Sequence, residues 1–387
     1  MGSTADKAPW ESIQFVSELN SFPIKPALLY EGWQEIPHDT IVTAKNRISD
    51  TIPSDEWEIR KKITNPYEAV FSGEDTQFPS LANVQPLSRS YFKMIEILHI
   101  SDFFTTANKK PFISAHVCEG PGGFIQAVVE RLTTDKIPAG GVYAMTLKPT
   151  KSHIPGWRRS IHFLKKYPHI HLEYGEDETG NILRPENQAS FCAKARGAQL
   201  FTADGGFDFS VNYTNQELMA FPLLLASFTM GLQSLAVGGT MVIKLFDIYG
   251  TATQDLFLGT ATFFSSFTLY KPATSRPCNS ERYFIAKGYL GSVKAAKWIA
   301  NLQQAQLKYE TSPFLGLGQD HITHLVEKNT WPQAVLDAVN EQIKWQETLQ
   351  ITTITETIQL QKDDIANKML VTLQKSRKWC EVFGVKM

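Results

Sequence analysis

The stretch His116-Val-Cys-Glu-Gly-Pro-Gly-Gly-Phe124 decides the fold of this chain. An apolar, strand-like segment precedes it at 112–117, and apolar residues at helical spacing follow it at 125–132. We therefore predict a turn that leads from a strand into a helix. Its glycines let the backbone pass close to a ligand, and the N-terminus of the following helix presents unpaired N–H groups. Because many nucleotide-binding folds share such a turn, it predicts a ligand loop without naming the ligand.

Three segments further along the chain place polar residues next to apolar runs. They are Thr202-Ala-Asp-Gly-Gly206, Val242-Ile-Lys244 and Asn279-Ser-Glu281. Ligands of open α/β sheets bind at the carboxyl ends of the central strands. We therefore expect Asp204, Lys244 and Glu281 to lie beside the glycine turn.

The order of apolar segments predicts an α/β fold with a doubly wound, parallel sheet. The expected strands are 112–118, 141–147, 169–174, 198–203, 240–247, 266–271 and 282–288, and the expected helices between and before them are 85–103, 122–133, 157–166, 186–195, 215–237 and 251–264. Residues 1–75 lack clean periodicity and predict an irregular N-terminal extension with short helices. Residues 291–387 contain long helical patterns but no catalytic cluster, and they predict a helical C-terminal module that braces the core or binds a partner.

Composition narrows the class of protein. Of the 387 residues 43% are hydrophobic, enough for a full core, and a net charge of −1 restricts any nucleic-acid binding to local basic patches. The four cysteines form no CxxC pair, which argues against structural zinc and for a reducing compartment. The N-terminus has no apolar signal region. The apolar run 221–237 is interpreted as a buried helix because it contains Gln233 and continues into a strand.

Lys244 ends a buried strand, where a partly desolvated lysine can take a proton from a hydroxyl group. Asp204 and Glu281 would hold and tune that lysine. Each of the three also has an ordinary structural interpretation: a lysine that reaches water from a strand end, a turn aspartate and a surface ion pair. Lys93, in the helical segment 85–103, is by itself a residue of a solvated helix face.

Several motifs together resemble the RrmJ/FtsJ-type ribose 2′-O-methyltransferases, most closely those that act on the mRNA cap. They occur in the family's order and spacing from about residue 60 to 290, so 76–290 is expected to be the methyltransferase domain. The motifs are Asn65-Pro-Tyr-Glu68, Ser90-Tyr-Phe-Lys93-Met, Cys118-Glu-Gly-Pro-Gly-Gly-Phe124, Met145-Thr-Leu-Lys148, Tyr174-Gly-Glu176, Arg184-Pro-Glu-Asn187, Thr202-Ala-Asp-Gly-Gly-Phe207, Ile243-Lys-Leu-Phe-Asp247 and Lys271-Pro-Ala-Thr-Ser-Arg-Pro-Cys-Asn-Ser-Glu-Arg-Tyr283.

The resemblance implies a complete set of site residues. The family's catalytic Lys-Asp-Lys-Glu tetrad matches Lys93, Asp204, Lys244 and Glu281. Its S-adenosylmethionine site matches Glu119, Gly120, Pro121, Gly122, Gly123, Phe124, Thr146, Asp204 and Asn181, the last in a Gly180-Asn181 pair where the family usually has Gly-Asp. Its cap contacts resemble Asn279 and Arg276 together with the basic cluster Arg60, Lys61 and Lys62. No metal is implied.

The expected reaction is methyl transfer from S-adenosylmethionine to the ribose 2′-hydroxyl of the first transcribed nucleotide, cap 0 to cap 1, with Lys244 orienting or deprotonating the hydroxyl. The alternatives are the second cap nucleotide, rRNA or tRNA, or a silent RNA-binding scaffold of the same fold. A dehydrogenase fits poorly, because Thr146-Leu147-Lys148 offers no acid for a dinucleotide ribose.

RNA binding is expected at a basic segment between Gly141 and Ile170, which has no Asp or Glu; an amphipathic helix face explains it equally well. Its basic residues are Lys148, Lys151, Arg158, Arg159, Lys165 and Lys166. The expected partners are capped RNA and, through the C-terminal helices, a protein, with no membrane. The expected location is cytoplasmic, as for a viral enzyme, with the nucleus as the alternative because of short basic runs at 60–62 and 375–378.

Overall fold

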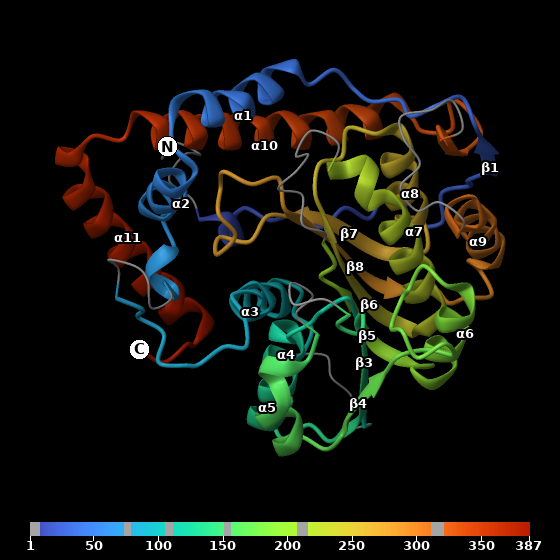
Figure 1. Cartoon of the computed structure of the whole chain (residues 1–387). Coiled ribbons are helices and arrows are strands. Elements are labelled where there is room, and N and C mark those ends of the chain that lie inside the picture. Colours follow the sequence, from blue (N-terminus) through green and yellow to red (C-terminus); the bar gives the residue numbers. More distant parts are fainter. Residues whose placement is uncertain (1–7, 73–78, 105–110, 151–155, 207–215, 311–320) are drawn as a thin grey trace.

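A computed structural model describes residues 8–72, 79–104, 111–150, 156–206, 216–310 and 321–387. Its centre is a sheet of seven strands in the order β4-β3-β2-β5-β6-β8-β7 (Figure 1). The strands are β2 (Phe112–Val117), β3 (Ala139–Met145), β4 (Ile170–Glu173), β5 (Ala198–Ala203), β6 (Leu235–Leu245), β7 (Phe264–Tyr270) and β8 (Arg282–Tyr289). All seven expected strands form, which confirms the α/β class.

The expectation of an all-parallel sheet was wrong for one strand. Strands β4, β3, β2, β5 and β6 run parallel, but β8 is antiparallel to both β6 and β7. A parallel neighbour requires a long crossover, usually through a helix. The connection from β7 to β8, residues 271–281, contains no helix, so β8 turns back beside β7.

Helices cover both faces of the sheet (Figure 1). One face carries α3 (Ser90–Ile100), α4 (Gly123–Thr134) and α5 (Ile161–Lys166), and the other carries α6 (Pro185–Lys194), α7 (Gln216–Ser234), α8 (Thr251–Ala261) and α9 (Ala296–Glu310). The expected helix 157–166 splits into a short 3-10 turn, η4 (Arg158–Ser160), and α5. Residues 221–237 lie in α7 and the start of β6, and none of the described helices is long and apolar enough to cross a membrane.

The N- and C-terminal segments pack against each other and against the sheet. The N-terminal elements are η2 (Pro9–Glu11), β1 (Pro26–Leu29), α1 (Asp39–Thr51), α2 (Ser54–Ile63) and η3 (Glu68–Val70), and the C-terminal ones after α9 are β9 (His324–Val326), α10 (Gln333–Gln359) and α11 (Lys362–Phe383). Strand β1 pairs with β9, and α1 lies along α10 (Figure 1). The sequence did not suggest β1 or β9.

The largest hydrophobic core contains residues of all three expected segments, among them Ile41, Phe221 and Trp298. The C-terminal helices therefore complete the core. Whether 1–75, 76–290 and 291–387 are separate folding units stays a prediction.

Candidate active site

Strand register brings the polar segments to one edge of the sheet. Val117 of β2 lies opposite Ala203 of β5, and Ala203 lies opposite Ile243 of β6. The next residues along the chain, Cys118, Asp204 and Lys244, therefore lie side by side, just after β2 and β5 and near the end of β6. Lys244 also lies opposite Tyr283 of β8, so Glu281, just before β8, reaches the same edge.

Lys244 and Asp204 form one half of the expected tetrad. The Lys244 Nζ lies 3.3 Å from Asp204 Oδ1 and donates to the Asp204 carbonyl oxygen at 2.8 Å. The Tyr283 hydroxyl donates to Asp204 Oδ1 at 2.8 Å. Burial, with Asp204 nearby, raises the pKa of Tyr283 well above its usual value, so this hydroxyl stays a donor. The lysine and the carboxylate thus have fixed positions.

Lys93 and Glu281 form the other half. Lys93 Nζ, on α3, lies 2.7 and 2.8 Å from the two carboxylate oxygens of Glu281. Burial alone would raise the pKa of Glu281, but the charges of Lys93 and Lys244 outweigh it and lower this pKa to about 2. Glu281 is therefore an anion that both lysines stabilise. The structure thus brings together all four residues that the sequence implied.

The loop of residues 271–281, here called the acceptor loop, is held from inside by Lys271. This buried ammonium donates to Asn279 Oδ1 at 2.8 Å, to the Asn279 carbonyl at 2.9 Å and to the Glu281 carbonyl at 2.8 Å. Burial lowers the pKa of Lys271 to about 7, against the attraction of Glu281. The sequence analysis missed this residue, although Lys271 ends an apolar strand as Lys244 does.

Glu96, which was also missed, fixes the start of the acceptor loop. Its fully buried carboxylate accepts from the Tyr270 hydroxyl at 2.8 Å, from the Ala273 N–H at 2.7 Å and from the Thr274 N–H and hydroxyl at 2.9 and 2.6 Å. Glu96 and Lys93 lie on the same helix, α3, so one helix holds both ends of the loop. Its position as the one acidic residue in the apolar segment 94–98 could have indicated this role from the sequence.

Arg276 projects from the acceptor loop towards the N-terminal segment. It pairs with Glu68 at 2.9 Å, and Arg89 pairs with the same carboxylate at 3.1 Å. Burial would raise the pKa of Glu68, but Arg276 and Arg89 lower it. Glu68 is 1% exposed at its side chain whereas Arg276 is 23% exposed, so Glu68 orients a guanidinium that solvent still reaches.

The basic cluster before Asn65 has mixed roles. Arg60 pairs with Glu56 and donates to the Ile358 and Leu360 carbonyls at 2.9 and 3.1 Å, so it caps the end of α10. Lys61 pairs with Glu58. Burial raises the pKa of Cys278, and the nearby charge of Lys61 opposes that rise. Lys61 of α2 therefore lies near the acceptor loop. Lys62 lies in the last turn of α2 and is half-buried. The structure therefore brings Arg276, Asn279 and Lys61 together and turns Arg60 to α10.

The predicted glycine turn, residues 118–123, here called the cofactor loop, joins β2 to α4. Gly122 has a φ of +108°, which a residue with a side chain rarely adopts, and it precedes α4 without a side-chain cap. A Cβ at Gly123 would lie 2.3 Å from the hydroxyl oxygens of Ser88 and Ser90. Phe124 is buried against Tyr283, and the Pro121 carbonyl accepts from Ser160. Packing within the protein thus requires several of these residues.

Glu119 provides a test of whether a cofactor fits. Burial raises the pKa of this carboxyl, His116 Nδ1 lies 3.3 Å from Oε2, and Thr202 donates to Oε1. Within the described residues Oε2 makes no hydrogen bond of acceptable geometry. A buried acceptor at the start of a glycine loop fits a ligand with hydroxyl or ammonium donors, such as S-adenosylmethionine.

Thr146 and Asn181 come together at the same edge. A Cβ at Gly180 would lie 2.0 Å from the Thr146 carbonyl, so the loop that carries Asn181 packs on the end of β3. Asn181 Oδ1 accepts from the Leu183 N–H at 3.0 Å, and buried Asn187 donates to the Asn181 carbonyl at 3.0 Å. The side-chain oxygen of Asn181 therefore already has one donor.

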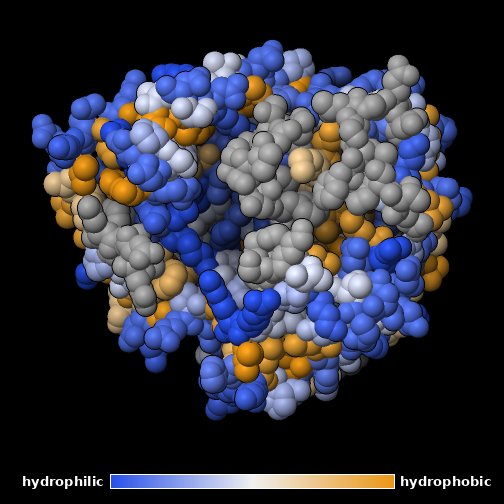
Figure 2. Space-filling view, viewed as in Figure 1, coloured by the Kyte–Doolittle hydropathy of each residue, from blue (hydrophilic) through white to orange (hydrophobic). Residues whose placement is uncertain are grey.

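Figure 2 shows a hollow with hydrophilic visible walls near the centre of the face seen in Figure 1.

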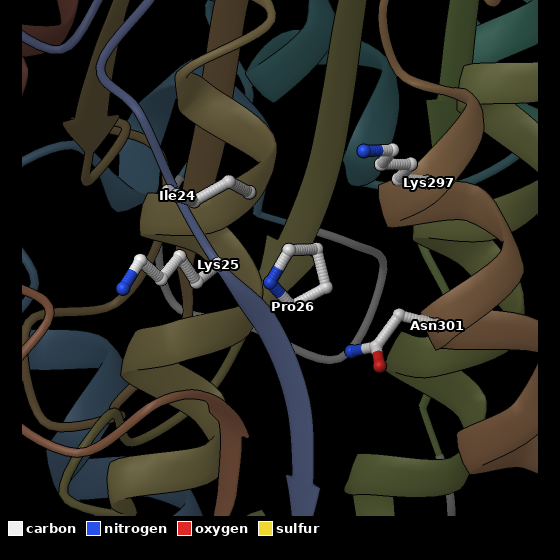
Figure 3. A pocket seen from close by; sticks show the side chains of 5 residues that line it. All are labelled: Ile24, Lys25, Pro26, Lys297 and Asn301. Atoms are coloured by element: carbon white, nitrogen blue, oxygen red, sulfur yellow. The ribbon is translucent and has the colours of Figure 1, made fainter.

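A pocket between β1 and α9 lies away from this edge and is lined by Ile24, Lys25, Pro26, Lys297 and Asn301 (Figure 3). It contains none of the expected site residues. The described residues include no group of three His, Cys, Asp or Glu side chains that could hold a metal ion.

The strand order, the glycine loop and the buried lysine–carboxylate pairs define a methyltransferase of the α/β type. Residues 86–289 match the model of the FtsJ-like methyltransferase family, and the chain belongs to that family. The resemblance seen in the motifs is thereby confirmed. Members of this family take the methyl group from S-adenosylmethionine, which confirms the expected cofactor.

Comparison with curated proteins gives relatives that share a name. The chain is 33% identical over 268 residues to a cap-specific mRNA (nucleoside-2′-O-)-methyltransferase 1 of Dictyostelium discoideum, covering 62% of this chain and 33% of that protein. It is 30% identical over 285 residues to the human protein of the same name, covering 67% and 32%. The chain thus spans about a third of the length of these relatives.

Among solved structures, a putative ribosomal RNA methyltransferase from Plasmodium falciparum is similar at 19% identity with a TM-score of 0.37. That match covers 53% of this chain and 99% of the other.

Proposed function

We propose that this chain transfers a methyl group from S-adenosylmethionine to a ribose 2′-hydroxyl of capped RNA, at the first transcribed nucleotide. The observation that carries the proposal is the pairing of Lys244 with Asp204 and of Lys93 with Glu281 beside the cofactor loop. The names of the relatives and the family membership support the same reaction.

The residues have distinct roles in this proposal. S-adenosylmethionine supplies an electrophilic methyl group. Lys244 orients the 2′-hydroxyl or takes its proton as the oxygen bonds to the methyl carbon, and the carbon–sulfur bond would break to release S-adenosylhomocysteine. Asp204 holds the lysine in place. Lys93 and Glu281 fix the ribose side of the site. Much of the rate enhancement comes from positioning and from charges that are already arranged.

The acceptor loop supplies contacts for the cap. Arg276 keeps exposed guanidinium surface while Glu68 orients it, and a guanidinium suits phosphate groups. Asn279 and Lys61 lie at the same loop.

Of the basic segment expected to bind RNA, Lys151 lies outside the described residues. Lys148 is half-exposed and near Glu178, and Arg158, Arg159, Lys165 and Lys166 are exposed on η4 and α5.

A comparison of RNA substrates tests the proposal. Short transcripts that differ only in the cap are incubated with labelled S-adenosylmethionine, and the methylated nucleotide is identified after nuclease digestion. We expect methylation of the first nucleotide of capped RNA only, and Asn279→Ala should raise the KM for it. Label on the second nucleotide, or equal methylation of uncapped rRNA or tRNA, would replace the first-nucleotide proposal. No transfer to any RNA by a protein that binds S-adenosylmethionine would favour the scaffold alternative.

The cellular setting remains part of the proposal. We propose cytoplasmic action, with the nucleus as the alternative, and a protein partner at the C-terminal helices. Exposed apolar residues of α11, Leu370 at 57% and Val371 at 45%, support such a partner. Fractionation of cells that express the tagged protein tests the location.

A further inference from the structure

Helix α10 contacts the acceptor loop through two buried glutamines. Gln350 Nε2 donates to the Cys278 carbonyl at 3.0 Å, and Gln346 Nε2 donates to the Asn279 carbonyl at 3.3 Å. The two glutamines are four residues apart, so they share one face of the helix. Both are at most 3% exposed. Burying a side-chain amide costs free energy unless the amide forms hydrogen bonds. The two bonds to the acceptor loop satisfy this requirement for both glutamines.

The contacts lead directly to the tetrad. The Asn279 carbonyl that accepts from Gln346 also accepts from Lys271 Nζ. Lys271 in turn donates to the Glu281 carbonyl, and Glu281 pairs with Lys93. A shift of α10 would therefore reach Glu281 through three successive hydrogen bonds.

Helix α10 is itself fixed at the end that follows these glutamines. Arg60 donates to the Ile358 and Leu360 carbonyls, and the hydroxyls of Thr64 and Thr357 lie 2.7 Å apart. Helix α1 packs along its other side, and Figure 1 shows α10 passing beside the loop between β7 and β8. These contacts hold α10 in a fixed position on the rest of the protein.

We propose that Gln346 and Gln350 are positioning residues of the acceptor site, which makes α10 a working part of the site although it lies outside the matched region 86–289. Their two bonds hold the acceptor loop in the conformation that places Asn279 and Glu281 for the ribose and cap. A test by methyl transfer rests on the proposed function. A test by amide hydrogen exchange in the acceptor loop does not.

The test replaces both glutamines by methionine, as Q346M/Q350M. Methionine has nearly the same length but cannot donate, so packing is kept while both bonds are lost. The matched control is Q342M, four residues before Gln346 on α10, where the side chain is exposed. Amide hydrogen exchange is followed at Ser275 and Asn279, whose N–H groups bond to the Pro272 and Arg276 carbonyls, with amides of β2 and β5 as internal references.

We expect exchange in the acceptor loop to rise about tenfold in Q346M/Q350M, as for the loss of two buried hydrogen bonds, with β2 and β5 unchanged. The KM for capped RNA should rise several-fold while S-adenosylmethionine affinity stays within about twofold. Unchanged loop exchange, or the same change in Q342M, would overturn the proposal. The single variants Q346M and Q350M answer the same question if the double variant does not fold. If the wild-type acceptor loop is protected from hydrogen exchange but the protein transfers no methyl group, the result would count against the proposed function and not against the role of the two glutamines.

Discussion

At the scale of single residues, the two lysines of the site are held differently. Lys244 contacts both the side chain and the backbone carbonyl of Asp204, whereas Lys93 pairs, among the described residues, with Glu281. Lys244→Ala should therefore lower methyl transfer by roughly 10²–10⁴-fold, the contribution of a general base. Binding of S-adenosylmethionine, measured by calorimetry, should stay nearly intact. Activity within a few-fold of wild type would remove Lys244 from the mechanism. The control is Lys328→Ala, at a side chain that is 53% exposed and outside both the site and the basic segment.

Lys271 should make the stability of the protein depend on pH. Burial lowers its pKa to about 7 in the folded chain, while an unperturbed lysine titrates near about 10.4. Between these values the unfolded chain binds a proton that the folded chain does not, so stability rises with pH there.

Lys271→Met removes this titration and keeps an apolar side chain of similar length. The difference in free energy of unfolding, wild type minus variant, should therefore grow in favour of wild type from about pH 7 to about pH 10. Denaturant unfolding at several pH values measures it, with Lys148→Met as the exposed control. A difference that stays flat across that range would refute the assignment.

The residues of the tetrad were predictable from the sequence because each lies where an apolar segment begins or ends, or matches a family motif. Their supports were harder to predict. Glu96 meets Thr274 across 178 positions of sequence, and a local pattern carries no information on such a contact. The contact of Arg60 with the end of α10 also joins distant parts of the chain, so the basic cluster did not indicate it.

At the scale of elements, the strand–turn–helix unit around the cofactor loop was predicted from its residues, but the reason for its glycines was only partly right. The expectation was space for a ligand, whereas Gly123 is also required by Ser88 and Ser90. The reversed β8 was not predicted, because strand periodicity is the same in parallel and antiparallel strands and only the helix-free connection distinguishes them.

Gly122→Val should reduce the affinity for S-adenosylmethionine, measured by calorimetry. The substitution forces a branched side chain into a φ of +108° at the start of α4 and against Trp157. Gly197→Val is the matched control, because Gly197 has a φ of +85° with nothing within 4 Å of its Cβ position. Equal affinity in both variants and wild type would mean that the loop serves folding only.

At the scale of the whole molecule, the segment after the matched region completes its packing. Trp298 of α9 is fully buried against Gly259 of α8, where a Cβ would lie 2.5 Å from the indole, and its Nε1 donates to Thr260 at 3.1 Å. The sequence predicted helices after residue 291 but not what they pack on, because helical periodicity identifies an apolar face and not its partner. Trp298→Ala should lower the free energy of unfolding by about 3–5 kcal/mol.

A chain that ends at Ser292 tests the role of the C-terminal helices as a whole. It would lose Trp298 and Ile354 from the largest core, Trp379 from the second, and both glutamine contacts to the acceptor loop. Exposed apolar surface on α7 and α8 should then cause aggregation, seen by light scattering and dye binding. A soluble shortened chain that binds S-adenosylmethionine and methylates RNA at the wild-type rate would show that these helices serve only a partner. If it binds S-adenosylmethionine but transfers no methyl group, the acceptor loop depends on α10 for its conformation even when the sheet folds without it.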